Sequence, residues 1–244
     1  MRAANVLVAD VLEELAAMVE PGITTAELDA AAEAKVRAAG AEPAFKGYRG
    51  YPATLCASVN EQVVHGIPSK RALVEGDIIS LDMGVKLSGF YGDSAVTVPV
   101  GQVSEEASKL LRVTREALEK GIAQVRLGGR VSDIGHAIQQ YVEAHGFSVV
   151  REFVGHGIGA ALHEEPQIAN YGEPGRGPRL AEGMTLAIEP MVNIGRPAVR
   201  VLADGWTAVT KDGSLSAHFE HTVAVTKTGP LVLTRRDVPA RLRA

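Results

Sequence analysis

The chain has 244 residues, of which 46% are hydrophobic and 22% charged, so one large domain or two small ones can bury an ordinary core. The formal net charge of −4 gives no electrostatic case for nucleic acid or an anionic membrane as a partner. No stretch free of Asp, Glu, Lys and Arg exceeds 11 residues, whereas a bilayer-spanning helix needs roughly 20. The single cysteine, Cys56, excludes an internal disulfide framework. We therefore expect a soluble protein of the reducing cytoplasm.

Two helices are expected in the first forty residues. Apolar residues recur at helical spacing from Val6 to Val19, and Pro21-Gly22 marks the end of this segment. Thr24 and Glu27 have the spacing of a capping box, which predicts a second helix that ends at Gly40.

A second helical pair is expected from Glu105 to Arg126 and, after a glycine pair, from a cap at Ser132 to Gly146. The two pairs superimpose at a constant offset of 106 residues. The matching positions are Gly22 with Gly128, Leu28 with Ile134, Val36 with Val142 and Gly40 with Gly146. This offset favours two similar halves, approximately residues 1–100 and 101–244, within a single domain of residues 1–244.

Between and after the helical pairs, the apolar period changes to two. Asp77–Val85 and Phe90–Val98 are predicted strands joined by a turn at residues 86–89, and Thr185–Ile188 is a short apolar strand. Thr207–Thr210 and Leu215–Thr226 are predicted to form another hairpin around an Asp-Gly turn. Because helices and antiparallel strands come in blocks, the expected fold class is α+β.

The first hairpin carries two aspartates that indicate a cation site. If the turn is centred between Leu87 and Ser88, Asp82 and Asp93 lie opposite each other with Cβ atoms ~5 Å apart. At an effective dielectric constant of ~20, their repulsion is about 3 kcal/mol. Asp82 also lies in an apolar run that should be buried, so a proton or a cation is expected between the carboxylates. The alternative is a turn shifted by one residue, with both carboxylates solvated.

Three further residues on or beside apolar strands add to this pair. His156 lies in a glycine-rich segment that leaves room for a ligand, and Glu189 follows a short apolar strand. Glu220 lies within a strand, where alternation places it on the same face as His218. Since buried carboxylates must be paired or coordinated, the five residues predict one oxygen-rich site. Such a site suits Mn, Fe, Co or Zn, and two ions can share bridging carboxylates and a hydroxide.

Longer motifs carry a resemblance to a known family. They are Gly50-Tyr51-Pro52, Ser58-Val59-Asn60-Glu61, Val64-His65-Gly66-Ile67-Pro68, Gly76-Asp77-Ile78, Gly92-Asp93, Gly155-His156-Gly157-Ile158-Gly159, His163-Glu164-Glu165-Pro166, Ile188-Glu189-Pro190 and Ser216-Ala217-His218-Phe219-Glu220-His221-Thr222. Over essentially its whole length, the sequence resembles the type I methionine aminopeptidases of the bacterial kind. The resemblance implies the pita-bread fold, in which two αα–β halves are related by a pseudo-two-fold axis around a curved antiparallel sheet.

The resemblance also implies a centre of two divalent metal ions, with Co, Mn, Fe and Zn as candidates. Asp82 would chelate one ion, His156 and Glu189 would hold the other, and Asp93 and Glu220 would bridge both. Glu189 would also accept a proton from the metal-bound water, so that a bridging hydroxide attacks the peptide bond.

The same resemblance assigns substrate contacts. His65 and His163 would polarise the scissile carbonyl or guide the leaving group's proton. The methionine pocket would comprise Tyr48, Tyr51, Cys56 and Trp206, together with Phe45, where the family often has cysteine, and Leu162, where it often has phenylalanine. The implied function is removal of the N-terminal methionine from nascent proteins with a small second residue, by a cytoplasmic monomer close to the ribosome.

Two alternatives share the fold. Xaa-Pro aminopeptidases and dipeptidases of the same superfamily use the same five ligands, but they typically add a large N-terminal domain that 244 residues cannot accommodate. Other pita-bread relatives have lost their metals and act as binding proteins, although all five ligand types are present in this chain.

Two further alternatives have other chemistries. Gly155-x-Gly157-x-x-Ala160 imitates a dinucleotide-binding fingerprint, but Pro166 ends any following helix and residues 171–178 are a predicted loop. A thiol hydrolase that uses Cys56 with His65 would be insensitive to chelators, and a lone apolar-flanked cysteine is more typical of packing.

Overall fold

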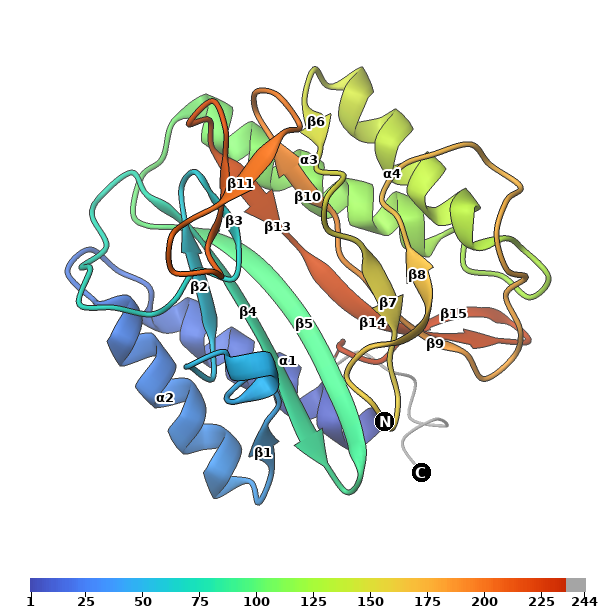
Figure 1. Cartoon of the computed structure of the whole chain (residues 1–244), viewed down its shortest axis with the longest axis horizontal. Coiled ribbons are helices and arrows are strands. Elements are labelled where there is room, and N and C mark those ends of the chain that lie inside the picture. The colour runs from blue at the N-terminus through green and yellow to red at the C-terminus, as the bar shows by residue number, and fades with distance from the viewer. Residues whose placement is uncertain (236–244) are drawn as a thin grey trace.

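Helices α1 (Arg2–Met18) and α2 (Thr25–Ala38) begin the computed structural model, which describes residues 1–235 (Figure 1). The predicted capping box is present. The Oγ1 atom of Thr24 accepts the backbone N–H of Glu27 at 3.2 Å, and Glu27 Oε2 accepts the backbone N–H of Thr24 at 2.8 Å. The apolar faces of both helices pack on the strands of the first half. The central members of this core are Val8, Leu15, Leu28, Val36, Ile79 and Met83.

Helices α3 (Glu105–Ile122) and α4 (Val131–Ala144) form the second pair. Helices α2 and α4 are both 14 residues long, and their bounds differ by the predicted offset of 106 residues. Gly40 and Gly146, which follow the two helices, both have positive φ, at 70° and 83°. The predicted offset is therefore confirmed for α2 and α4, but the bounds of α1 and α3 do not follow it. The division of the chain into halves near residue 100 stays a prediction.

The predicted cap of α4 at Ser132 is wrong. The N-cap residue is Arg130, whose backbone N–H donates to Asp133 Oδ2 at 2.9 Å. The Ser132 hydroxyl oxygen instead accepts the backbone N–H of Arg176 at 2.7 Å, because the predicted loop of residues 171–178 runs past this helix end. A tertiary contact thus outcompetes the local capping preference of serine.

The strands form antiparallel ladders. A nine-stranded sheet has the order β1-β4-β5-β14-β9-β7-β8, with β2 also on β4 and β15 also on β14. Two three-stranded sheets have the orders β13-β10-β6 and β11-β12-β3. The bounds are β1 (Glu42–Pro43), β2 (Cys56–Val59), β3 (Gln62–Val64), β4 (Ile78–Leu87), β5 (Phe90–Pro99), β6 (Ser148–Val149), β7 (Gly155–Gly157), β8 (Glu164–Ile168), β9 (Thr185–Ile188), β10 (Met191–Asn193), β11 (Val199–Val201), β12 (Ala208–Thr210), β13 (Ser216–His218), β14 (Glu220–Thr226) and β15 (Gly229–Val232), with the 3₁₀ helix η1 (Tyr48–Gly50) between β1 and β2.

Strands β4 and β5 form the predicted hairpin, but the centre of its turn lies one residue later than predicted, so the predicted register is wrong. The turn is centred on Ser88 and Gly89, whose φ angles are 52° and 81°, as a type I′ turn requires. Asp82 therefore pairs with Ala95, and Asp93 with Gly84. The two aspartates still share one face, because Asp82 lies two residues from the partner of Asp93 on the same strand, but they are diagonal neighbours rather than direct partners.

The hairpin predicted from Thr207–Thr210 and Leu215–Thr226 is also wrong. Strand β12 pairs with β11 and β3, while β13 pairs with β10. The carboxylate of Asp212 accepts the backbone N–H groups of Arg196 and Ser214, at 2.7 and 3.1 Å, which holds the connecting loop against another segment. Gly213 has a positive φ of 74°, but Asp212 does not, so the Asp-Gly pair lies in a connecting loop and not in a two-residue hairpin turn.

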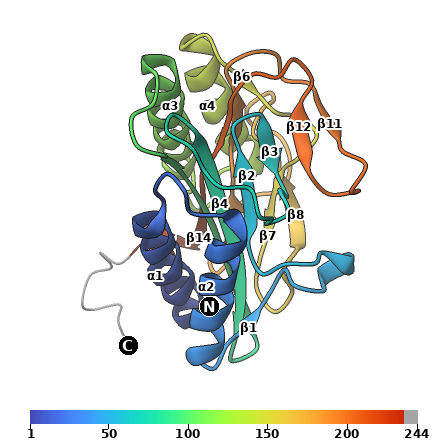
Figure 2. The same cartoon turned by 90° about the vertical axis from the view of Figure 1, so that its left-hand side faces the viewer.

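The helices lie on one side of the sheet, whereas β11 and β12 project on the other (Figure 2). A second core lies under α3 and α4, and its central members are Leu110, Ile134, Ile138, Leu186 and Val223. Among residues 1–235, no helix has the length and apolar character needed to cross a membrane. The face that the helices leave free carries the site described below.

Gly135 of α4 gives a test of this packing. A Cβ at this position would overlap the carbonyl oxygen of Ala169 and lie 2.7 Å from the backbone nitrogen of Tyr171. We expect Gly135→Ala to lower the free energy of unfolding by about 2 kcal/mol or more, although Gly→Ala inside a helix ordinarily raises it by about 1 kcal/mol. Urea unfolding measures this, with the exposed helix position Gln140→Ala as a control expected to change little. A more stable Gly135→Ala variant would contradict the packing.

Candidate metal centre and active site

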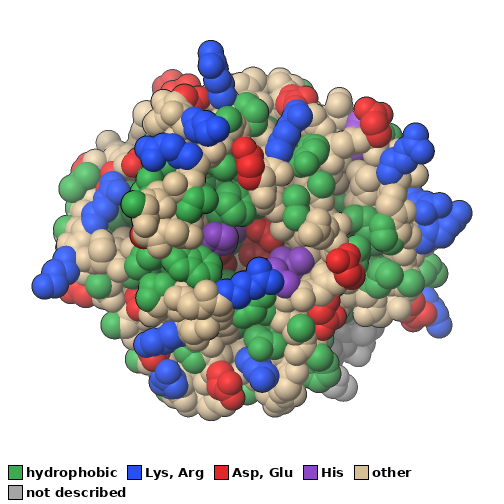
Figure 3. Space-filling view, viewed as in Figure 1, with side chains coloured by type: hydrophobic (Ala, Val, Ile, Leu, Met, Phe, Trp, Pro, Cys, Tyr) green, Lys and Arg blue, Asp and Glu red, His purple; other side chains and the backbone are tan. Residues whose placement is uncertain are grey.

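A cavity of about 170 Å³ opens on the face of the sheet that the helices leave free. Figure 3 shows a hollow near the centre of this face, with histidine side chains at its rim and acidic side chains at its floor. The residues that line the cavity are Phe45, Tyr48, Arg49, Tyr51, Cys56, His65, Asp82, Asp93, His156, Leu162, His163, Glu189, Trp206 and Glu220. The fold therefore brings together all thirteen residues that the sequence analysis predicted for the site, and adds Arg49.

The acidic floor comes from neighbouring strands of the large sheet. Asp82 lies on β4, Asp93 on β5 and Glu220 at the start of β14, and these three strands are adjacent. Glu189 directly follows β9, and His156 is the central residue of β7. Because side chains alternate between the two faces of a strand, one face of the sheet collects all five.

The imidazole of His156 has a fixed orientation. Its Nδ1 lies 2.9 Å from the carbonyl oxygen of Gly157, which can only accept, so Nδ1 carries the proton and donates. The free Nε2 points to the carboxylates, at 3.6 Å from Glu189 Oε1 and 4.0 Å from Asp93 Oδ2. Donor atoms of Asp93, His156 and Glu220 all lie within 4.8 Å of one another.

Burial changes the protonation of this cluster. Burial raises the pKa of Asp82 to about 7, and burial together with the neighbouring carboxylates raises the pKa of Asp93, Glu189 and Glu220 well above the usual range. For His156 the direction is opposite, since burial lowers its pKa to about 4 and leaves the ring neutral. The four carboxyl groups thus have a high desolvation cost when charged, unless a cation lies among them.

The residues fit a divalent metal centre. Asp93 Oδ1 and Glu220 Oε1 are buried and make no hydrogen bond within the described part of the chain. Unpartnered carboxylate oxygens beside a neutral imidazole lone pair are the donor set of hard or borderline divalent cations. The hydrogen bond that fixes His156 resembles the outer-shell support common at metal-binding histidines.

The pH dependence of the protein's stability tests whether these carboxyl groups are buried together. Their raised pKa values mean that the folded metal-free protein binds more protons than the unfolded chain, so its unfolding free energy falls as pH rises through the raised values. Below about pH 6.5, the lowered pKa values of the buried histidines act in the opposite direction. We expect the Tm of the chelator-treated protein to fall between about pH 6.5 and 8.5. Excess divalent cation should remove this dependence, and a flat metal-free profile would contradict the cluster.

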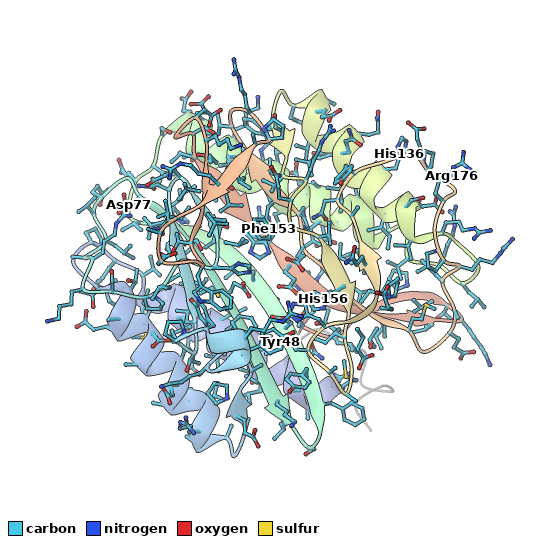
Figure 4. The ribbon with its side chains drawn as sticks, in the orientation of Figure 1. Tyr48, Asp77, His136, Phe153, His156 and Arg176 are labelled. Atoms are coloured by element: carbon cyan, nitrogen blue, oxygen red, sulfur yellow. The ribbon has the colours of Figure 1, made fainter. Side chains whose placement is uncertain are left out.

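The two predicted substrate histidines, His65 and His163, both line the cavity. Nδ1 of His163 is 2.9 Å from the hydroxyl of Tyr48, and its ring centroid is 4.2 Å from that of His156. His65 has a φ of 60°, and its ring meets the ring of Phe153 edge-on at 5.4 Å. Figure 4 shows Tyr48, Phe153 and His156 around the centre of this face. Burial lowers the pKa of His65 to about 4 and also lowers that of His163, so both rings are neutral at pH 7.

The residues predicted to bind methionine form the apolar side of the cavity. Phe45, Tyr51, Cys56 and Leu162 are buried in one cluster, against which Tyr48 and Trp206 pack. The Tyr51 hydroxyl lies 3.0 Å from the carbonyl oxygens of both Leu55 and Gly66, which fixes its ring against the site. Burial raises the pKa of the Cys56 thiol well above its usual value, which disfavours the thiolate that a thiol hydrolase needs.

The sequence analysis did not predict two residues of the site, His218 and Arg49. His218 is buried, its Nε2 lies 3.7 Å from Glu189 Oε2, and neither ring nitrogen has a hydrogen-bond partner among residues 1–235. The available signal was the alternation that places His218 on the face of Glu220. Arg49 lies between two predicted pocket tyrosines, but the short helix η1 that turns it to the cavity could not be foreseen.

Comparison with known proteins agrees with this geometry. The model of metallopeptidase family M24 matches residues 1–227. Methionine aminopeptidase 1 of Bacillus subtilis is 57% identical over 235 residues, which cover 96% of this chain and 95% of that protein. The chain belongs to family M24 and to its methionine aminopeptidases. A methionine aminopeptidase from Thermotoga maritima, known from a crystal structure, is 50% identical in sequence to this chain. The structural match covers 97% of this chain and 95% of that chain, with a TM-score of 0.95.

The fold also occurs in proteins with names other than methionine aminopeptidase. The prolidase of Pyrococcus horikoshii has a TM-score of 0.78 at 21% identity, over 96% of this chain and 60% of that one. At this identity the likeness shows the fold alone. The α+β pita-bread fold expected from the sequence is confirmed by these neighbours and by the curved antiparallel sheet.

Proposed function

We propose that this protein removes the N-terminal methionine from peptides and newly made proteins by metal-dependent hydrolysis. The observation that carries the proposal is a floor of buried, mutually close carboxylates and His156 beneath an apolar, aromatic side wall. The relative from Bacillus subtilis, named methionine aminopeptidase 1, supports it at 57% identity.

We propose two divalent ions, from among Co, Mn, Fe and Zn. Asp82 would hold one ion, His156 and Glu189 the other, and Asp93 and Glu220 would lie between them. When bound, such ions supply Lewis acidity toward water and toward the scissile carbonyl. In the absence of cations, this cluster has a high affinity for protons, which is consistent with a site built to bind positive charge.

The remaining polar side chains would move protons. The side chain of Glu189 is 15% exposed, so it can accept a proton from an attacking water at the floor of the cavity. The neutral imidazole of His163, fixed through Nδ1 to Tyr48, can donate from Nε2 to the developing oxyanion when Nδ1 accepts the Tyr48 hydroxyl proton. His65 would pass a proton to the departing amine.

The apolar wall would select methionine. An unbranched thioether side chain adapts to the aromatic surfaces of Tyr48, Tyr51 and Trp206 and fills the space beside Cys56. Phe45 and Leu162 would complete the pocket. Because the histidines crowd the rim next to the scissile bond, we propose that a small second residue is preferred. We further propose that the protein acts as a cytoplasmic monomer close to the ribosome.

Peptide assays test the function. Purified protein is incubated with Met-Ala-Ser and, separately, with Xaa-Pro peptides, with chelator or with added Mn or Co. We expect methionine release from Met-Ala-Ser that chelator abolishes and metal restores. Release from Xaa-Pro peptides alone would instead show an Xaa-Pro peptidase, and no release with any metal would favour a non-catalytic binding protein.

A further inference from the structure

Among the described residues 1–235, Arg49 is the only Lys or Arg that lines the cavity. Figure 3 shows a basic side chain beside the histidines at the mouth of the hollow, above its acidic floor. Arg49 itself is exposed, and its guanidinium carbon lies 5.4 Å from the centroid of the Tyr48 ring. The Tyr48 ring in turn stacks on the His163 ring at 5.3 Å. The cation is therefore held at the rim by its contact with Tyr48, which also supports the His163 ring.

The backbone and the surroundings also set Arg49 apart. Its φ of 49° and ψ of 24° are left-handed, a conformation that non-glycine residues adopt rarely. Other arginines pair with carboxylates, as Arg37 does with Glu33 and Arg112 with Glu116. Within residues 1–235, Arg49 has no ion-pair partner, so its planar set of donors is available to a ligand.

Under the proposed function, the substrate must pass this rim. Its methionine side chain occupies the apolar wall and its scissile bond lies over the acidic floor, so the following residues leave past His163 and Arg49. The two ring contacts place the guanidinium within about 11 Å of the His163 ring, the length of about three extended residues. Within that length, the groups that best match a guanidinium are carboxylates, which it can bind through two parallel hydrogen bonds.

We propose that Arg49 binds a carboxylate on the leaving side of the scissile bond, and that the protein therefore favours peptides with a negative charge shortly after the methionine. This inference rests on the proposed function. The carboxylate has two sources, the free C-terminus of a short peptide and an acidic side chain at the third position.

Two peptide pairs separate these sources. Met-Ala-Ser is compared with Met-Ala-Ser-amide, and Met-Ala-Asp-amide with Met-Ala-Asn-amide, using metal-loaded enzyme. We expect the charged member of at least one pair to have a kcat/KM higher by about three- to tenfold, mainly through KM, with a smaller ratio at high salt. If only the first pair differs in kcat/KM, Arg49 binds the free C-terminus. If only the second pair differs, Arg49 binds the acidic side chain. Equal values in both pairs would overturn the proposal.

Arg49→Gln removes the charge while keeping a side chain of similar length at the same backbone conformation. We expect it to abolish the preference, and Arg49→Lys to retain part of it. Lys46→Gln is the matched control, because Lys46 is exposed in the same segment, pairs with Glu33 and does not line the cavity. A preference that persists in Arg49→Gln, or that disappears equally in Lys46→Gln, would refute the role of Arg49.

Binding without turnover separates this inference from the proposed function. Trp206 is the only tryptophan and lines the same cavity, so its fluorescence reports occupancy in chelator-treated protein. We expect the charged peptides to bind more tightly than their neutral partners, and Arg49→Gln to equalise the Kd values. If no peptide is hydrolysed under any condition, the proposed function fails, while this titration still decides whether Arg49 binds the carboxylate.

Discussion

Replacing Asp93 by Asn is expected to lower methionine release by about 10³-fold or more and to reduce bound metal. One buried carboxylate oxygen of Asp93 has no hydrogen-bond partner within residues 1–235. This carboxylate lies next to donor atoms of His156 and Glu220. The amide replaces one anionic oxygen by an N–H donor of similar size, so the attraction for a cation falls while the packing is kept. Metal content after dialysis and kcat/KM at saturating metal measure the two effects.

The same variant should be more stable than the wild type when both are metal-free. At pH 8, the wild type must either ionise buried carboxyls or keep protons on them, since burial and the charge of Asp82 raise the pKa of Asp93. A neutral amide has no such cost, so the Tm of the metal-free Asp93→Asn variant should lie above that of the metal-free wild type. Glu33→Gln, at a half-buried carboxylate that pairs with Lys46 and does not line the cavity, should leave metal content and release unchanged. Normal metal content in Asp93→Asn would contradict the assigned centre.

His163→Ala is expected to lower kcat by about 10²- to 10³-fold while metal content stays at the wild-type level. The ring lies at the rim, fixed to Tyr48 rather than to the carboxylates, so its loss removes a proton donor and leaves the floor intact. His156→Ala should instead lose both metal and turnover, because His156 Nε2 faces Glu189 and Asp93. Metal analysis of the two variants together with steady-state kinetics distinguishes these roles.

A histidine far from the cavity provides the control. His136 lies on α4 at the edge of the molecule, with Nδ1 3.0 Å from the carbonyl oxygen of Gly172 (Figure 4). His136→Ala should retain both metal and turnover. If His163→Ala and His156→Ala were depleted of metal to the same extent, the division between substrate and metal histidines would be wrong.

Much of the fold could be predicted because its signals are local. The Thr24 capping box, the glycines after α2 and α4 and the strand Thr185–Ile188 depend on residues within one turn or one strand of each other. The predicted cap at Ser132 was wrong because the Ser132 hydroxyl accepts a backbone N–H from a loop more than forty residues away in the sequence. The predicted register of β4 and β5 was wrong because the register depends on which two turn residues adopt positive φ. In the structure these residues are Ser88 and Gly89, not Leu87 and Ser88.

The candidate site shows the same division. The sequence by itself determined the residue types, the faces on which Asp82, Asp93 and Glu220 lie, and the conflict that buried carboxylates create without a cation. Only the tertiary structure decided that β14, β9 and β7 follow β5 in the sheet, and that His218 and Arg49 complete the floor and the rim. The physical reason is that side-chain alternation follows from local backbone geometry. Strand pairing between segments more than a hundred residues apart instead depends on the packing of the whole chain.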